Sequence, residues 1–155
     1  AENMIIKNYY RPPFSRNGFL QFHKIRENGK RIADLFDVRS GRGVDSSAGD
    51  LSGGNQQKAI VGREIDSDPD LLIAVQPTRG LDVGAIEYIH HRLVEQRDRG
   101  KAVLLVSLEL DEIFNLSDRI AVINSGEVID IVNTSDTSEE EIGLMMAGIR
   151  KEKAV

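Results

Sequence analysis

The sequence predicts an α/β protein in which a helical segment precedes a parallel β-sheet. After residue 70, short apolar runs alternate with helical patterns, and these runs are Leu71–Val75, Ala102–Val106 and Arg119–Ile123. Such alternation is typical of parallel sheets whose strands are connected by helices. Before residue 40, apolar residues instead recur at helical spacing, and we find no strand pattern there.

The composition is that of one ordinary globular domain, or of a domain with a fragment of a second. Hydrophobic residues make up 40% of the 155-residue chain and charged residues 29%, and there is no cysteine. The lack of cysteine excludes a disulfide framework and thiolate metal sites. No apolar run approaches the roughly 18 residues of a membrane-spanning helix, and the first residues do not resemble a signal peptide. We therefore do not expect secretion.

The net charge of −5 is unevenly distributed along the chain. Residues 1–43 carry nine basic and four acidic side chains, whereas the remainder carries 11 basic and 21 acidic ones. Such asymmetry is typical of two surfaces with different neighbours, although a solvated face of mixed charge explains it equally well. A nucleic-acid partner is not expected, because it requires a stronger basic stripe.

The first 50 residues are expected to form a helical region and a loop. Tyr9–Phe14 is predicted to be extended, because its two prolines exclude helix before them. Its aromatic side chains either pack locally or dock on a partner helix. The helical pattern of Gly18–Val38 is interrupted by Asn28-Gly29, which we expect to separate two helices or kink one. Ser40–Gly49 has the composition of a loop.

After residue 50 each predicted element has a local signal. Ser52, Asp82 and Ser138 are placed to cap helices that run to about Ile65, Arg97 and Met146. The continuous apolar run at 71–75 predicts a strand that is covered on both faces. The further predicted elements are a strand at 102–106, a helix at 109–116, a strand at 119–123 and a strand at 128–132. We expect the last two strands to form an antiparallel hairpin at one edge of the parallel sheet.

The most specific chemical signal is the segment Leu51-Ser52-Gly53-Gly54-Asn55-Gln56-Gln57-Lys58 at the start of a helix. The hydroxyl of Ser52 can cap the helix, and two glycines allow another group to approach the backbone closely. Free N–H groups and the helix dipole would make this end an anion site. Ser-Gly-Gly alone would indicate no more than a capped helix after a glycine turn, but all eight residues together are far more specific.

These eight residues resemble the signature motif of ATP-binding-cassette (ABC) ATPases, in the form typical of sugar and nucleoside importers. The resemblance continues in register from about residue 15 to residue 148. The matching segments are Leu71–Thr78 for the strand ending in Asp-Glu-Pro-Thr, Arg79–Ala85 for the following turn, Val103–Leu110 for the strand near the switch histidine, and Ser117–Arg119. The family fold is a P-loop NTPase-like (RecA-like) parallel sheet with a helical subdomain.

At three chemically important positions this chain departs from the family pattern. Val75 stands where the family has the aspartate that holds Mg²⁺, and Gln76 stands where it has the catalytic glutamate. Leu108 stands at the position of the switch histidine. Valine and leucine offer no ligand or hydrogen bond, and glutamine cannot accept a proton. The resemblance therefore implies that no catalytic residue is intact here, although Gln76 could also be a plain polar residue at a strand end. No metal site is expected.

A phosphate-binding Gly-x-x-x-x-Gly-Lys-Ser/Thr loop is absent from the sequence. In the family this loop lies well upstream of the signature, so the chain resembles the C-terminal half of the RecA-like core with its helical subdomain. The implied division is a helical subdomain and linker at 1–50, a signature helix at 51–66, the C-terminal half of the core at 67–150, and a tail at 151–155.

The resemblance implies the second, degenerate cassette in the ATP-binding subunit of a simple-sugar or nucleoside importer. The subunit would use ATP and Mg²⁺, whereas these 155 residues alone should neither bind ATP tightly nor hydrolyse it. The implied site residues are Leu51, Ser52, Gly53, Gly54, Asn55 and Gln56, which would contact ATP held by a partner cassette, and the D-loop Gly80, Leu81 and Asp82. The implied partners are a first cassette of the same subunit or a second ATPase subunit, permease subunits and, indirectly, a solute-binding protein. The implied location is cytoplasmic, at the inner face of the membrane.

Two other classes of function stay open. One is a soluble tandem-cassette ABC protein that acts on ribosomes or DNA, which the acidic balance and the Asn-Gln-Gln-Lys form of the signature disfavour. The other is an interaction module that binds a partner and no nucleotide. Neighbouring permease genes would identify the importer, and ATP binding would separate it from the module.

Overall fold

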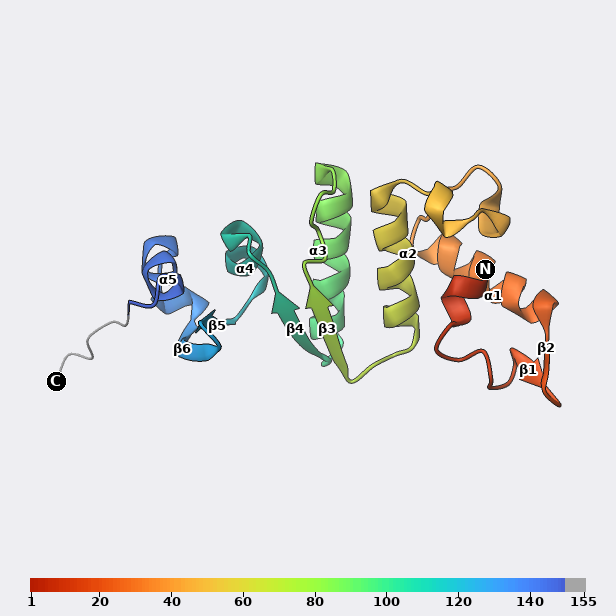
Figure 1. The fold of residues 1–155 in the computed structure, drawn as a ribbon, viewed down its shortest axis with the longest axis horizontal. Coiled ribbons are helices and arrows are strands. Elements are labelled where there is room, and N and C mark those ends of the chain that lie inside the picture. The colour runs from red at the N-terminus through yellow and green to blue at the C-terminus, as the bar shows by residue number, and fades with distance from the viewer. Residues whose placement is uncertain (150–155) are drawn as a thin grey trace. The chain divides into compact units, whose positions relative to one another are not determined.

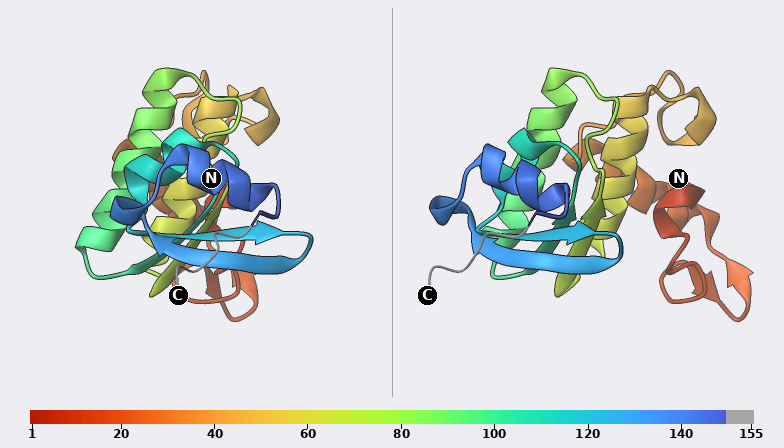
Figure 2. Two further views of the ribbon diagram at one scale, coloured as in Figure 1. Left: turned by 90° about the vertical axis from the view of Figure 1, so that its left-hand side faces the viewer. Right: turned by 60° about the vertical axis from the view of Figure 1, so that its left-hand side comes forward.

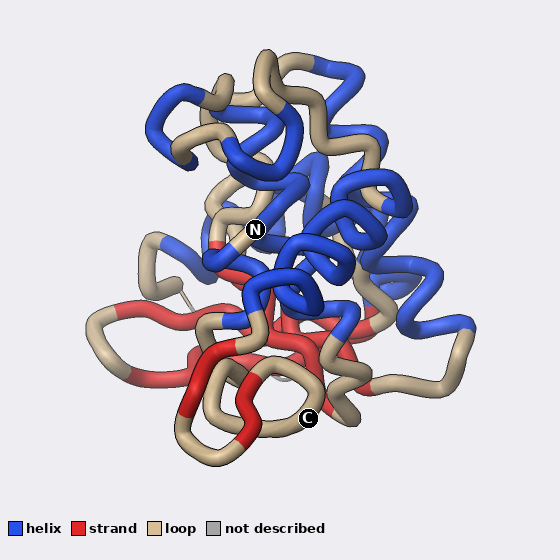
Figure 3. The backbone as a smooth tube through the Cα atoms, turned by 90° about the vertical axis from the view of Figure 1, so that its right-hand side faces the viewer, coloured by secondary structure: helices blue, strands red, loops and turns tan. Residues whose placement is uncertain are grey.

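The computed structural model describes residues 1–149, so the predicted tail at 151–155 lies outside the described residues. The chain divides into two compact units, one from Ala1 to Leu104 and one from Leu105 onward. Figure 1 shows the elements in order along the chain, and Figures 2 and 3 show them from other directions. Among the described residues, no helix is both long and apolar enough to cross a bilayer.

The N-terminal region contains a β-hairpin, so our expectation that it holds no strand was wrong. A short 3₁₀ helix, η1 (Glu2–Ile5), is followed by β1 (Ser15–Arg16) and β2 (Phe19–Leu20), which pair antiparallel. The turn between them has φ of 51° at Asn17 and 82° at Gly18. Positive φ at both central residues is typical of a type I′ hairpin turn, which Asn-Gly favours.

Helix α1 (Phe22–Leu35) runs through Asn28-Gly29 without a break, so the prediction that this dipeptide separates two helices was wrong. A Cβ at Gly29 would lie 2.9 Å from the Cα of Ala1. The glycine therefore allows the first residues of the chain to approach the helix backbone, and it does not end the helix. Ile25 and Ile32, on the same helix, are almost completely buried.

The signature helix is α2 (Gly53–Asp66), close to its predicted bounds. The predicted loop before it contains two short 3₁₀ turns, η2 (Gly43–Asp45) and η3 (Ala48–Asp50). After α2 come β3 (Leu71–Val75), α3 (Val83–Asp98) and β4 (Ala102–Val106), and β3 and β4 form a small parallel sheet. In Figures 1 and 2, α2 and α3 lie side by side.

One face of β3 is exposed, although the apolar run predicted a strand covered on both faces. Leu71, Ile73 and Val75 are each more than half exposed, while Leu72 between them is buried. In a strand, alternate side chains point to opposite faces. The described residues thus cover only one face of a strand whose sequence is apolar on both.

The second unit contains α4 (Leu110–Leu116), the hairpin β5 (Arg119–Asn124) and β6 (Glu127–Asn133), the 3₁₀ turn η4 (Thr134–Asp136), and α5 (Glu139–Met146). The predicted antiparallel hairpin is confirmed. The predicted placement of this hairpin at the edge of one parallel sheet is not confirmed, because the described strands form three separate two-stranded sheets. The core of this unit is the cluster Ile120, Val122, Ile142 and Met145.

Candidate functional site

The start of the signature helix is held by its own side chains. The Oγ of Ser52 accepts a hydrogen bond from the Asn55 side-chain amide at 2.9 Å and a longer one from its backbone N–H at 3.5 Å. Gln56 donates from its side chain to the carbonyl of Leu51 at 3.0 Å. Ser52 is therefore the predicted N-cap, and the polar residues that follow it stabilise the turn before the helix.

The structure brings the signature glycines together with the predicted D-loop. A Cβ at Gly53 would lie 3.9 Å from Leu81, and one at Gly54 would lie 3.3 Å from the Cβ of Ala85 and 3.8 Å from Asp82. Gly54 thus permits a tighter approach between α2 and α3 than a larger residue would allow. Asp82 caps α3 by accepting from the N–H of Ala85 at 2.9 Å. Two helix starts, whose first N–H groups have no partner within the helix itself, therefore meet at this place.

The end of β3 carries the first two departures from the family pattern. Val75 ends the strand and is 62% exposed. Gln76 follows with φ of 50°, a left-handed conformation that is uncommon for a residue other than glycine. The chain then turns through Thr78, which is buried, and Gly80, with φ of 73°, into the cap of α3. Neither side chain at the strand end is a carboxylate.

The third departure, Leu108, lies in the second unit and is 68% exposed. It follows β4, and the next residue, Glu109, donates its backbone N–H to the Oγ of Ser107 at 3.1 Å. An exposed leucine can neither donate nor accept a hydrogen bond.

Sequence reasoning missed a polar junction behind the signature. The backbone N–H of Arg39 donates to the Oδ1 of Asn55 at 2.7 Å, and Lys58 donates to the Oδ2 of Asp37 at 2.9 Å. Hydrogen bonds from Lys58 and then from Arg39 lower the pKa of the Asp37 carboxyl. These partners lie 16 and 21 residues apart in the chain, and no local pattern indicates that they meet.

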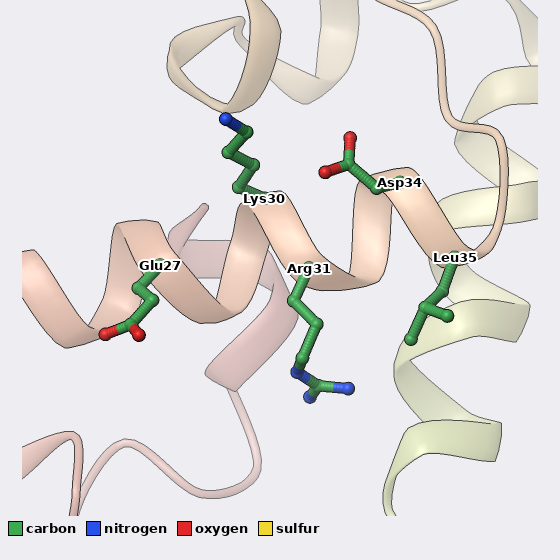
Figure 4. Close-up of a pocket in the computed structure, with 5 residues that line it drawn as sticks. All are labelled: Glu27, Lys30, Arg31, Asp34 and Leu35. Carbon is green, nitrogen blue, oxygen red and sulfur yellow. The ribbon is translucent and has the colours of Figure 1, made fainter.

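Two hollows lie in the first unit. A groove of about 350 Å³ borders the signature and is lined by Asn3, Met4, Ala48, Gly49, Leu51, Gln56, Ala59, Ile60 and Arg63. The other lies on α1, where Figure 4 shows Lys30 and Asp34 on one side of the helix and Arg31 on the opposite side. Arg31 binds both carboxylate oxygens of Asp66, at 2.7 and 2.6 Å, and so joins α1 to the end of α2. Of these two hollows, only the groove of about 350 Å³ adjoins the signature.

Comparison with known proteins gives close relatives among import proteins. The nucleoside import ATP-binding protein NupA of Lactococcus lactis is 58% identical over 148 residues, which is 96% of this chain and 29% of the relative. The guanosine import ATP-binding protein NupO of Bacillus subtilis is 55% identical, over 99% of this chain and 30% of the relative. The glucose import ATP-binding protein TsgD13 of Haloferax volcanii is 47% identical, over 94% of this chain and 27% of the relative. The chain therefore spans less than a third of the length of these relatives.

Solved structures agree on the fold. The ATP-binding subunit of an ABC transporter superposes with a TM-score of 0.70 at 20% identity, covering 94% of this chain and 61% of the other. A dimeric ATP-binding cassette with bound ADP and Pi superposes with a TM-score of 0.63 at 24% identity, covering 78% of this chain and 52% of the other. No family model matches the chain. The relatives nevertheless align along almost all of it, and the P-loop NTPase fold of the solved cassettes agrees with the predicted fold class. The chain belongs to the ABC ATPases and corresponds to the C-terminal part of their sugar- and nucleoside-import members.

Proposed function

We propose that this chain acts within the ATP-binding subunit of an ABC importer for simple sugars or nucleosides. Its signature, Leu51–Gln56, contacts ATP that is bound by a partner cassette, while its own site does not hydrolyse nucleotide. The partner cassette belongs to the same subunit or to a second one. Permease subunits complete the importer, and a solute-binding protein delivers its cargo.

The observation that carries this proposal is the geometry of the α2 start. Ser52 and Gly53 are exposed there, and the first N–H groups of a helix have no partner within it. Phosphoryl transfer requires donors aimed at the oxygens on which negative charge develops, and a helix start supplies them together with a favourable dipole. The contacts of the glycines with Leu81 and Asp82 support a role for this D-loop beside the signature.

The residues at the strand end support the second half of the proposal. The side chain of Val75 has no atom that could bind Mg²⁺, and the amide of Gln76 cannot accept a proton from an attacking water. Among residues 1–149, no cluster of three His, Cys, Asp or Glu side chains could hold a metal ion. The residues present here therefore do not fit Mg²⁺, and this chain's own site contributes no hydrolytic step.

The groove beside the signature supports contact with a permease. It is lined by apolar side chains such as Met4, Leu51 and Ile60, with Arg63 at its border. Such a lining fits an amphipathic helix. In this proposal the chain lies at the cytoplasmic face of the membrane. Residues 1–50 form the helical subdomain, 51–66 the signature helix, and 67–150 the C-terminal half of the core.

The test is steady-state phosphate release by the reconstituted importer that carries Gly53→Asp in this chain. Among the described residues, a Cβ at Gly53 would have within 4 Å only a Leu81 methyl group, at 3.9 Å, so we expect the variant to fold. An acidic residue in the first turn even favours the helix, because it complements the dipole. The added negative charge should nevertheless repel phosphate oxygens and lower ATPase activity by orders of magnitude. Gly41→Asp is the matched control, because Gly41 has open space around it and lies outside the signature.

The degenerate site is tested in the same assay. Gln76→Ala should change turnover little, because the carboxylate that would activate water is already absent. Gln76→Glu alone should not restore a second active site, since Val75 and Leu108 remain. If Gln76→Ala abolished turnover while Gly53→Asp had no effect, the roles of the two composite sites would be reversed.

A further inference from the structure

A second set of contacts holds the signature helix α2 near its middle, at a distance from the end that carries the glycines. The Nζ of Lys58, on α2, lies 2.9 Å from the Asp37 carboxylate and 4.7 Å from the ring centroid of Tyr88 on α3. The Lys58 side chain is only 16% exposed. One ammonium group thus joins three segments, and its shielding from water strengthens its attraction to the ring.

The ring of Tyr88, and not its hydroxyl, makes these contacts. The guanidinium of Arg92 lies 5.0 Å from the Tyr88 ring centroid and 5.7 Å from that of Phe36, at the end of α1. The Tyr88 hydroxyl is buried, and within residues 1–149 it has no hydrogen-bond partner. Two cations therefore share one aromatic ring at the junction of α1, α2 and α3.

This junction is well placed to set the direction of α2. Gly53 precedes Lys58 by five residues, or about 7.5 Å along a helix. A tilt of roughly 8° at Lys58 would therefore move Gly53 by about 1 Å. At the far end, Asp66 is fixed to Arg31. Without the Lys58 contacts, the helix start would still be held by the hydrogen bond from Arg39 to Asn55 and by the close approach of Gly54 to Ala85, but it would lose its link to Tyr88.

We propose that Lys58 and Tyr88 are positioning residues for the partner cassette's ATP site. Their cation–π contact sets where the N–H groups of Gly53 and Gly54 stand, so it acts on turnover without touching nucleotide. The inference rests on the proposed function, because it requires that the signature contribute to ATP hydrolysis in a partner cassette. A misplacement of about 1 Å can cost up to roughly 100-fold in rate, and partial displacement gives an expected loss of about tenfold.

The experiment measures kcat and KM for ATP, per assembled importer, with variants of the full-length subunit. Tyr88→Leu and Lys58→Met remove the cation–π contact, and each should lower kcat about tenfold while KM changes less than twofold. Tyr88→Phe keeps the ring and Lys58→Arg keeps the cation, so both should retain at least half of the parental kcat. Asp37→Asn removes the ion pairs of Asp37 with Lys58 and Arg39 but leaves the cation–π contact in place, so it should also stay near the parent. If Tyr88→Leu assembles poorly, Lys58→Met gives the same test with the ring in place.

A purely structural role gives a different result. In that case Tyr88→Leu and Lys58→Met would lower the melting temperature or the yield of complex, but kcat per assembled complex would stay parental, which overturns the proposal. An equal loss in Tyr88→Phe and Tyr88→Leu would also overturn it, because the hydroxyl would then be the active group. Gly53→Asp, measured in parallel, separates the two hypotheses. If it is silent, the proposed function fails, whereas if it abolishes turnover and Tyr88→Leu is silent, only the positioning role fails.

Discussion

Gly62 on α2 lies close against side chains of α1 and its C-terminal end, so adding one methyl group there tests how the signature helix is packed. A Cβ at Gly62 would lie 2.8 Å from the Cγ of Phe36 and 3.2 Å from Ile32. Ordinary contacts of a Cβ begin at about 3.4 Å, so the ring would have to move by 3.4 − 2.8, or about 0.6 Å. Phe36 is only 6% exposed, so its ring is packed among other residues.

Two opposing effects determine the stability of Gly62→Ala. Overpacking of a close-packed core costs about 1–3 kcal/mol, whereas replacing glycine by alanine in a helix contributes up to about 1 kcal/mol. Gly84→Ala, on α3 in the same unit, is the matched control, because its Cβ would make only an ordinary contact of 3.5 Å with Asp82. We therefore expect Gly62→Ala to be less stable than Gly84→Ala by about 1–3 kcal/mol.

Urea denaturation followed by circular dichroism measures this difference. The double variant Gly62→Ala/Phe36→Leu should recover part of the loss, because a smaller side chain frees space for the new methyl group, and the two changes are then not additive. Equal or greater stability of Gly62→Ala relative to Gly84→Ala would refute the close approach of the two helices.

Two further predictions concern charge and the exposed sheet face. Lys58 and Arg39 hold the pKa of Asp37 below its ordinary value of 3.8. The ionised carboxylate of Asp37 therefore stabilises the folded state above pH 3.8, and this stabilisation is lost as the pH falls through the lowered pKa. Thermal melting should accordingly show Asp37→Asn to be less stable than the parent at pH 7, and the two should converge once the pH has fallen below the lowered pKa of Asp37. The 155-residue chain should also self-associate through the exposed face of β3, and Ile73→Glu should reduce this association in light scattering more than Ile131→Glu on β6 does. A parent chain that stays monomeric over a wide concentration range would contradict the last expectation.

The parts of the fold that the sequence predicted depend on neighbours within a few residues. Ser52, Asp82 and Ser138 cap their helices as expected, because each accepts from an N–H three residues ahead. The hairpin at Asn17-Gly18 was missed, although this dipeptide is a strong turn signal, because its strands are only two residues long and show no alternation.

Other features could not be predicted, because they depend on residues far apart in the chain. Asn28-Gly29 was expected to separate two helices or kink one, whereas the missing side chain of Gly29 makes room for Ala1. The contact between Lys58 and Tyr88 spans 30 positions, and neither residue has a neighbour in sequence that would identify the other. The sequence likewise predicted the strands β3 to β6 but not the division of the strands into separate two-stranded sheets.

The two ends of the candidate site differ in the kind of group that they keep, and this difference carries the functional argument. At the start of α2 the cap of Ser52 and the two glycines are present, and these elements supply backbone donors. At the end of β3, Val75 and Gln76 have no acidic group. Donors can act on a nucleotide held by another cassette, because they need only reach its phosphate oxygens. A catalytic carboxylate must stand beside its own metal ion and water, so its loss disables only the site to which it belongs. This difference between the two ends is the basis of our proposal that the chain completes a partner's site and does not hydrolyse nucleotide at its own.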